Sequence, residues 1–205
     1  DKEKSKRINN KFMIYDLQEK VNEVFTTETD INGHIPALVK YGQECEHITE
    51  MGVRGIQSTW AFLGSSPKHL RSYDIQDPKE WDQDIQNVYD TAEAYGIDFT
   101  FTLANVLEVE IEETDLLFLD TWHSYKQLKA ELALHADKTK KYIIFHDTTS
   151  FESIDEESYE MWGDEWKAEG IGIWKAIEEF LAANDHWVLE ERFTHNNGLT
   201  IIKRV

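Results

Sequence analysis

The stretch Asp115–Asp147, DLLFLDTWHSYKQLKAELALHADKTKKYIIFHD, decides the fold of this chain. It holds two unbroken apolar runs, Leu116–Leu119 and Tyr142–Phe145, with a segment of helical spacing between them. Strands that are buried on both faces of a parallel sheet have such continuous apolar sequences. The stretch therefore predicts two neighbouring parallel strands joined by a helix.

Charged and imidazole side chains follow both predicted strands. Asp120 and His123 come after the first strand, and His146 and Asp147 end the second. Open α/β sheets bind their ligands at the carboxyl ends of the strands. A carboxylate in that position is costly unless it has a partner, so we expect the reaction centre there.

The composition limits the kind of protein. With 205 residues, 40% of them hydrophobic, the chain is long enough for one domain with a substantial core. Its formal net charge of −19 attracts cations and repels phosphate groups, so a nucleic-acid partner is not expected. The single cysteine, Cys45, excludes an intrachain disulfide framework and a cysteine-based zinc site. Because no apolar run approaches the length of a membrane span and no signal peptide is evident, we expect a cytoplasmic protein without a membrane partner.

The remaining apolar patterns predict an N-terminal helical cap and a core domain. Helical spacing at 12–25 and from Pro36 to Cys45 gives a cap over residues 1–45. The core, residues 46–205, contains a predicted strand–helix–strand–helix–strand series, then the unit within Asp115–Asp147, then a helix and a hairpin around Asn197-Gly198. Parallel crossovers account for the first five strands, so the sequence predicts a doubly wound α/β fold.

Two segments of the core carry more specific expectations. Residues 79–95 predict one continuous helix with Trp81 on its buried face. Ile97–Leu103 alternates apolar and polar residues, which is typical of a half-exposed strand at the edge of a sheet.

The acidic segment 148–170 is too long for an ordinary connection, so it is either a lid or an insertion. It follows the fifth predicted strand and therefore leaves the sheet at the edge of the reaction centre. Its Trp162 and Trp166 could stack on a sugar or an aromatic acceptor. The alternative is a disordered or surface loop of acidic residues.

A glycine turn, Glu50-Met51-Gly52-Val53-Arg54-Gly55, joins the first strand of the core to its first helix. Small residues there let a ligand approach the backbone, and the helix start offers unpaired N–H groups. Asp74, at the end of the next strand, is placed to accept hydrogen bonds from ribose hydroxyls. The two features predict an adenosine-containing ligand. Because the nicotinamide-binding pattern GxGxxG is missing, a sulfonium cofactor is favoured over a nicotinamide.

The chain carries, in order, E-x-G-x-x-G, Asp74, FLDTWHSY, IIFHDT, and the closing GIWKAIEEFL and NNGLTIIKR. This order resembles the class I S-adenosylmethionine-dependent methyltransferases. More narrowly, the chain from Glu46 to Val205 looks like the cephalosporin-hydroxylase-like and macrocin-type sugar O-methyltransferases. The resemblance implies a Rossmann-like, mostly parallel seven-stranded sheet whose last strand is antiparallel.

S-adenosylmethionine is the cofactor that the resemblance implies. Asp120 would face its sulfonium end. The positions that the likeness assigns to the cofactor site, or to its neighbourhood, are Glu50, Gly52, Gly55, Ser58, Asp74, Asn105 and Asp120.

Metal-dependent members of the broader family carry an aspartate after the fourth strand and an acidic pair, or Asp-Asn, after the fifth. Asp120 and Asp147 match two of these positions, whereas His146 and Thr148 stand where the family has acidic or amide residues. The likeness implies Mg²⁺ held by Asp120 and Asp147, because carboxylates and water suit this ion. Alternatively, Asp120 holds the amino acid part of the cofactor and Asp147 caps the following loop. His146 is expected to be structural and to point into the opposite layer.

His123 is the candidate general base, because histidine titrates near neutral pH and can take a proton from a hydroxyl. It could instead only hydrogen-bond to the backbone at a helix start. The leading hypothesis is an O-methyltransferase for a sugar or another small hydroxylated molecule, with His123, Asp120 and Asp147 as catalytic residues. The rival is a catalytically silent cofactor-binding module with a regulatory or scaffolding role. An oxidoreductase on the same sheet is less favoured, and the N-terminal helices could pair in a homo-oligomer.

Overall fold

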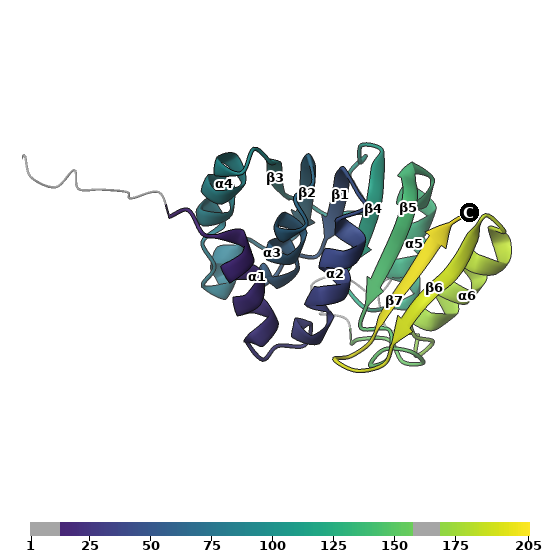
Figure 1. The fold of residues 1–205 in the computed structure, drawn as a ribbon. Coiled ribbons are helices and arrows are strands. Elements are labelled where there is room, and N and C mark those ends of the chain that lie inside the picture. The colour runs from purple at the N-terminus through teal and green to yellow at the C-terminus, as the bar shows by residue number, and fades with distance from the viewer. Residues whose placement is uncertain (1–12, 158–168) are drawn as a thin grey trace, which may run out of the picture.

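The structure, a computed structural model, describes residues 13–157 and 169–205. Residues 1–12 of the predicted cap and 158–168 of the predicted insertion, including Trp162 and Trp166, lie outside the described residues. The described residues form a seven-stranded sheet with helices on both faces, in the strand order β3-β2-β1-β4-β5-β7-β6 (Figure 1).

The strands are β1 (His47–Met51), β2 (His69–Asp74), β3 (Asp98–Leu103), β4 (Thr114–Leu119), β5 (Thr139–His146), β6 (Trp187–Phe193) and β7 (Leu199–Arg204). The described α-helices are α1 (Leu17–Thr26), α2 (Ile35–Gly42), α3 (Gln57–Gly64), α4 (Ile85–Ala94), α5 (Tyr125–His135) and α6 (Ile173–Ala183). Three short 3₁₀ turns accompany them, η1 (Asn32–His34), η2 (Pro78–Trp81) and η3 (Ala136–Lys138).

Strands β1 to β5 are parallel, and β7 pairs antiparallel with both β5 and β6. This confirms the predicted doubly wound, mostly parallel sheet with an antiparallel C-terminal hairpin. The hairpin turn contains Asn197 at φ 65° and Gly198 at φ 96°, as its Asn-Gly sequence predicts. Strand β3 lies at the edge of the sheet with Phe99 buried and Asp98 and Thr100 exposed, which confirms the half-exposed edge strand.

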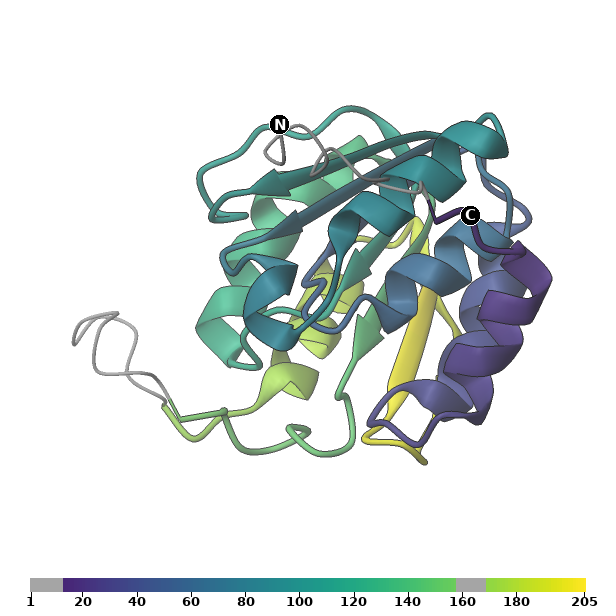
Figure 2. The same cartoon turned by 90° about the vertical axis from the view of Figure 1, so that its left-hand side faces the viewer.

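The unbroken apolarity of β4 and β5 follows from cover on both faces. In β4, Leu116 and Phe118 face the side of α1 to α4, whereas Leu117 and Leu119 face the side of α5 and α6. Figure 2 shows the purple N-terminal helices on one side of the sheet and the green α5 and α6 on the other. Full burial of each such side chain contributes about 1.5–3 kcal/mol.

Helix α1 packs on α3, whereas α2 packs both on α3 and on the sheet, where the Tyr41 ring contacts Tyr142 of β5 and the Tyr41 hydroxyl donates to Glu191 of β6 at 2.6 Å. Their buried residues, such as Leu17 and Leu38, belong to the same hydrophobic cluster as Phe62 of α3 and Ile48 of β1. None of the described helices is long and apolar enough to cross a membrane.

The predicted helix at 79–95 consists of two pieces, η2 and α4, so this expectation was wrong. Asp82 has a left-handed backbone with φ 55°, and the Asp84 side chain accepts a hydrogen bond from the Gln86 N–H and caps α4. Trp81 is consequently 40% exposed and lies under the guanidinium of Arg54, 4.6 Å from the ring centroid, instead of on a buried helix face.

A buried carboxylate, Glu50, joins three core elements. It lies in β1, and its two oxygens accept hydrogen bonds from Ser58 and Thr59 of α3 and from Ser72 of β2 at 2.5–3.1 Å. The side chain is 0% exposed. Burial raises the pKa of Glu50 to about 7, although the three hydroxyls favour the charged form.

The carboxyl ends of β1 and β4 approach closely at Gly52. This residue has φ +89°, and a Cβ at its position would overlap the main-chain carbonyl oxygen of Asp120. The Asp120 N–H in turn donates to the carbonyl of Met51 at 2.8 Å. The close approach of the two backbones therefore requires glycine at position 52, whether or not a ligand also binds there.

Gly52→Ala is expected to lower the free energy of unfolding by more than about 3 kcal/mol, because it combines an unfavourable φ with a backbone clash. Gly96→Ala is the matched control, since Gly96 has φ +71° but no atom within 4 Å of its Cβ position. That variant is expected to lose only about 1–2 kcal/mol. Urea unfolding of both variants measures the difference, and equal losses would contradict the clash.

Glu50→Gln is expected to change how stability depends on pH. A carboxyl whose pKa rises to about 7 on folding contributes stability that is complete below its unfolded pKa of 4.5 and is lost as pH rises through 7. The neutral amide has no such loss. Above pH 7 the stability of Glu50→Gln relative to wild type is therefore expected to be on the order of 3 kcal/mol more favourable than the same difference at pH 4. Unfolding curves at pH 4, 6 and 8 test this, and parallel pH profiles would refute it.

Candidate active site

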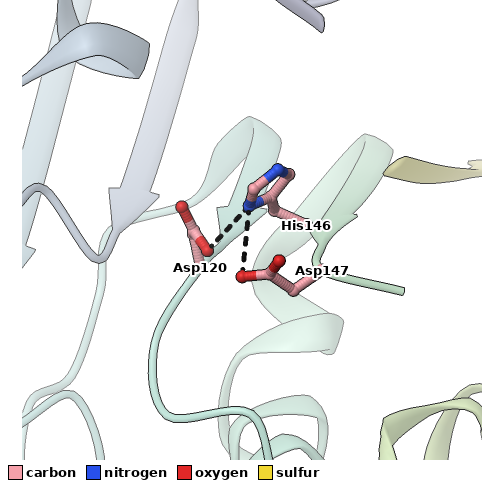
Figure 3. Close-up of side chains that lie close together, drawn as sticks. All are labelled: Asp120, His146 and Asp147. Carbon is pink, nitrogen blue, oxygen red and sulfur yellow. Dashed lines mark hydrogen bonds and ion pairs between the residues drawn. The ribbon is translucent and has the colours of Figure 1, made fainter. Parts of the chain in front are cut away.

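The residues predicted for the reaction centre converge at the carboxyl ends of β4 and β5. Asp120 follows β4 directly, His146 is the last residue of β5, and Asp147 comes next. The His146 Nδ1 lies 3.1 Å from Asp120 Oδ1 and 3.5 Å from Asp147 Oδ2 (Figure 3). Parallel pairing of the two strands, with Leu119 beside Phe145, brings these ends together as predicted.

His123 completes the cluster from the loop between β4 and α5. Its Nε2 lies 3.1 Å from Asp120 Oδ1 and 2.9 Å from Asp147 Oδ2. The Ser124 hydroxyl accepts a hydrogen bond from the Gln127 N–H and caps α5. This cap fixes the helix start, and with it the position of His123, which lies in the loop one residue before the cap.

The expectation that His146 points away from the centre was wrong. Its Nδ1 faces both aspartates, and its Nε2–H donates to the main-chain oxygen of Asn196 at 3.3 Å. The reason lies in the backbone of Asp147, which has a left-handed φ of 59°. In an extended strand, consecutive side chains point to opposite faces, but this turn brings the Asp147 side chain back to the same side as His146. Thr148, the other departure from the family pattern, is buried and bonds to Thr200 instead.

The four side chains compensate one another's charge. Burial alone would raise the pKa of Asp120, but the charge of His146 and hydrogen bonds from both histidines lower it to about 2. Likewise, the hydrogen bonds from His123 and His146 overcome burial and hold the pKa of Asp147 far below its usual range. Two charged imidazoles thus balance two carboxylates.

The histidines are held in their protonated form by the same contacts. Burial alone would lower the pKa of His146, yet the charge and hydrogen bonds of Asp120 and Asp147 raise it to about 10. The pKa of His123 is also raised well above its ordinary value against the effect of burial, by hydrogen bonds to Asp120, Asp147 and Glu156. In this arrangement His123 keeps its proton at neutral pH. It can serve as a base only when a ligand replaces its carboxylate partners.

Asp120, His146 and Asp147 form a candidate metal site. Each offers one ligand atom, and these atoms lie within 4.8 Å of one another. Asp147 Oδ1 is buried and has no hydrogen-bond partner within the described residues, so a cation would satisfy it. The imidazole donor favours a transition metal over Mg²⁺, which prefers an all-oxygen shell, and the two carboxylates suit Mn²⁺ among the transition metals. The residues therefore fit a divalent cation that displaces protons from the imidazoles.

Besides Asp120, the predicted cofactor residues lie at the ends of β1, β2 and β3 and in the first turn of α3. Glu50 and Ser58 are buried beneath the glycine turn and bonded to each other. The Asp74 carboxylate clamps that turn, because its Oδ2 accepts from the N–H groups of Val53 and Arg54 at 2.7 and 3.0 Å. Its Oδ1 accepts from the N–H of Gln76 at 2.8 Å, so these three hydrogen bonds leave room for about one further donor on the carboxylate.

Gly55 and Asn105 occupy looser positions. The atoms nearest to a Cβ on Gly55 would be those at the end of the flexible Gln57 side chain. Asn105 is exposed in the turn after β3, where its side-chain oxygen accepts from the Leu107 N–H at 3.0 Å. The structure therefore brings Gly52, Gly55 and Asp74 to one turn and leaves Asn105 on a neighbouring one.

Sequence reasoning missed two exposed apolar side chains at the same edge. Ile75 and Leu103 are 50% and 57% exposed, and Leu103 is the register partner of Asp74. Large apolar groups left open beside a clamped glycine turn fit a flat, apolar ligand such as a nucleobase. The sequence showed only that an apolar residue stands at the end of each of two predicted strands, and it did not show that both side chains are exposed.

Sequence reasoning also missed Phe151 and Glu156, which precede the undescribed part of the acidic segment. The Phe151 ring stacks on His123, and Glu156 Oε2 lies 3.0 Å from His123 Nδ1. Composition could place acidic residues near the site but could not select Glu156 among them.

No protein-family model and no curated protein matches this sequence. Solved structures do match. An O-methyltransferase from Bacillus cereus, in complex with S-adenosylhomocysteine, has a TM-score of 0.60 at 14% identity over 92% of this chain and 90% of that one. A 1,6-didemethyltoxoflavin-N1-methyltransferase from Burkholderia thailandensis has a TM-score of 0.56 at 14% identity over 91% and 83%. A magnesium protoporphyrin IX methyltransferase from Synechocystis, with bound S-adenosylhomocysteine, has a TM-score of 0.55 at 12% identity over 92% and 94%. This chain therefore has the Rossmann-like fold of the S-adenosylmethionine-dependent methyltransferases.

Proposed function

We propose that this protein is an S-adenosylmethionine-dependent methyltransferase that methylates an oxygen of a small hydroxylated molecule, such as a sugar. The observation that carries the proposal is the convergence of Asp120, His123, His146 and Asp147 at the strand ends of a methyltransferase fold. Strongly perturbed ionisable groups gather preferentially where proton chemistry occurs. The cluster therefore favours an enzyme over a catalytically silent binding module.

The cofactor assignment is supported by the fold and by the ends of β1 to β3. Structural neighbours contain bound S-adenosylhomocysteine, and the Burkholderia protein also contains bound 1,6-didemethyltoxoflavin. In this chain, Asp74 offers a carboxylate to ribose hydroxyls, and Ile75 and Leu103 offer apolar cover to the adenine. S-adenosylmethionine, when bound, supplies a methyl group on a positively charged sulfur.

The acceptor is proposed to bind where Asp120, Asp147 and His123 meet. An acceptor hydroxyl there can donate a hydrogen bond to a carboxylate in place of the His123 Nε2–H. Without that carboxylate partner the pKa of His123 falls and its Nε2 proton can leave to solvent, so that the neutral Nε2 can then take the hydroxyl proton. Much of the acceleration would come from holding the two reactants in line. The side chains proposed for these roles are held in place by one another: His123 contacts both Asp120 and Asp147, and Asp147 also contacts His146.

A divalent cation at Asp120, His146 and Asp147 would supply a second source of acidity, because a metal lowers the pKa of a hydroxyl bound to it. We infer Mn²⁺ as the best-fitting ion from the mixed nitrogen and oxygen donors, with Mg²⁺ as the weaker candidate.

Calorimetric titration with S-adenosylhomocysteine is expected to show binding to the wild-type protein. Asp74→Ala should weaken it by at least about tenfold, because the charged acceptor for ribose and the clamp on the glycine turn are both lost. Asp77→Ala is the matched control, since Asp77 lies in the same loop and only caps η2. Absence of binding to the wild-type protein would refute the proposed function.

Asp147→Asn is expected to weaken Mn²⁺ binding well beyond the roughly 10- to 100-fold typical of second-shell substitutions. The same variant, and Asp120→Asn, should slow methyl transfer by at least about 100-fold across a panel of methyl glycosides and simple phenols. Asp137→Asn, at an exposed aspartate of η3, serves as the control.

Calorimetry with Mn²⁺ and transfer of radiolabelled methyl groups are the measurements. Unchanged turnover in both site variants would exclude a catalytic role for these carboxylates. Transfer that persists in wild-type protein without any Mn²⁺ binding would exclude the metal and keep the methyltransferase.

A further inference from the structure

The acidic segment after β5 forms hydrogen bonds to His123 through Glu156. The Glu156 Oε2 accepts from the main-chain N–H of His123 at 3.2 Å and lies 3.0 Å from its Nδ1. The Glu156 N–H donates to the His123 carbonyl at 2.8 Å. One residue thus binds both the backbone and the ring of His123.

Phe151 of the same segment fixes the plane of that ring. The two rings are parallel, with 1° between their planes and 4.8 Å between their centroids. A stacked neighbour prevents tilting of the imidazole, while Glu156 prevents its rotation within the plane. Together they leave His123 one orientation.

Glu156 is itself held firmly, because Asp155 anchors the segment beside α5. The buried Asp155 carboxylate accepts from the N–H groups of Tyr125 at 2.8 Å, Glu169 at 2.8 Å and Gly172 at 2.9 Å. Tyr125 is the first residue of α5 and lies two residues after His123. The anchor therefore ties Glu156 to the chain that carries its partner.

These contacts decide which nitrogen of His123 faces the candidate active site. An ionised carboxylate only accepts hydrogen bonds, so the Nδ1 bonded to Glu156 carries a hydrogen. Nε2 is the nitrogen left to face Asp120 and Asp147, at 3.1 and 2.9 Å. The partner of the far nitrogen commonly sets the tautomer and direction of a working histidine.

We propose that Glu156 is a positioning residue: it holds the Nδ1–H of His123 and so presents Nε2 to the point between Asp120 and Asp147. Its value for methyl transfer rests on the proposed function, but the orientation of the ring does not. Within the described residues the hydrogen bonds of Glu156 all join it to His123, so we expect it to act through His123.

The test compares Glu156→Ala, Glu156→Gln and the control Glu157→Ala, which removes the neighbouring exposed glutamate. Protein labelled with ¹⁵N-histidine and saturated with S-adenosylhomocysteine is studied by long-range ¹H–¹⁵N NMR, which assigns the protonated nitrogens of His123. The alanine variant is expected to lose the protected Nδ1–H signal. The glutamine variant, whose amide oxygen can still accept, and the control are expected to keep it.

Methyl transfer to the fastest member of the glycoside and phenol panel gives the second readout. Glu156→Ala should lower kcat by about 10- to 100-fold while KM for the acceptor changes less than about threefold. Glu156→Gln should restore most of kcat, and Glu157→Ala should match wild type.

A wild-type His123 signal and wild-type kcat in Glu156→Ala would overturn the proposal. If Glu156→Ala unfolds at a lower temperature than wild type, the result for Glu156→Gln decides. A retained Nδ1–H signal together with a retained kcat in Glu156→Gln supports the positioning role. A lost kcat with an unchanged His123 signal overturns the proposal. If no acceptor is methylated by any variant, the proposed function fails, and the NMR comparison still decides the orientation of His123.

Discussion

The pairing of two aspartates with two histidines at the ends of β4 and β5 is the interaction on which the rest of the structure depends. Asp147 and His146 are almost wholly buried, with side-chain exposures of 7% and 1%. Breaking one partner out of a buried pair typically costs about 3–5 kcal/mol, because the other charge stays behind unpaired. Each partner is placed by a different feature of the fold: the order of the strands, the start of α5 and the left-handed turn at Asp147. All three features therefore have to be in place for the charges to pair.

The same pairing limits what the centre does before a ligand arrives. With both imidazoles protonated, the carboxylates are neutralised, and neither His123 nor His146 is a free base or a free metal ligand. A cation or an acceptor hydroxyl has to take over a carboxylate partner before an imidazole can release its proton. The imidazole rings are thus oriented before a ligand binds, whereas their ability to accept a proton or a metal ion depends on which ligand binds.

The sequence predicted the type of sheet and the pairing of β4 with β5 correctly, but it predicted the direction of the His146 side chain wrongly. Continuous apolar runs predicted that β4 and β5 are neighbours, because only strands covered on both faces tolerate them. The direction of His146 could not follow from the period of two, because the left-handed Asp147 ends that period one residue later. Glu50 was assigned to the cofactor site by its motif, yet it lies wholly inside the core among hydroxyls. Whether it also acts on a cofactor remains a prediction.

Loops from distant parts of the chain supply the contacts that periodicity does not encode. Asn196, in the hairpin turn, accepts hydrogen bonds on its main-chain oxygen from His34 at 3.0 Å and from His146 at 3.3 Å. Its side-chain amide donates to the carbonyl of Thr29 and so ties the turn to the N-terminal region. Glu156 supports His123 from the opposite direction. Both histidines of the cluster are therefore oriented through the ring nitrogen that faces away from the aspartates, once by a backbone carbonyl and once by a carboxylate. The strand ends of a common fold thus supply the side chains of this site, whereas loops set the orientation of these side chains. For this reason the fold was easier to predict from the sequence than the geometry of the site.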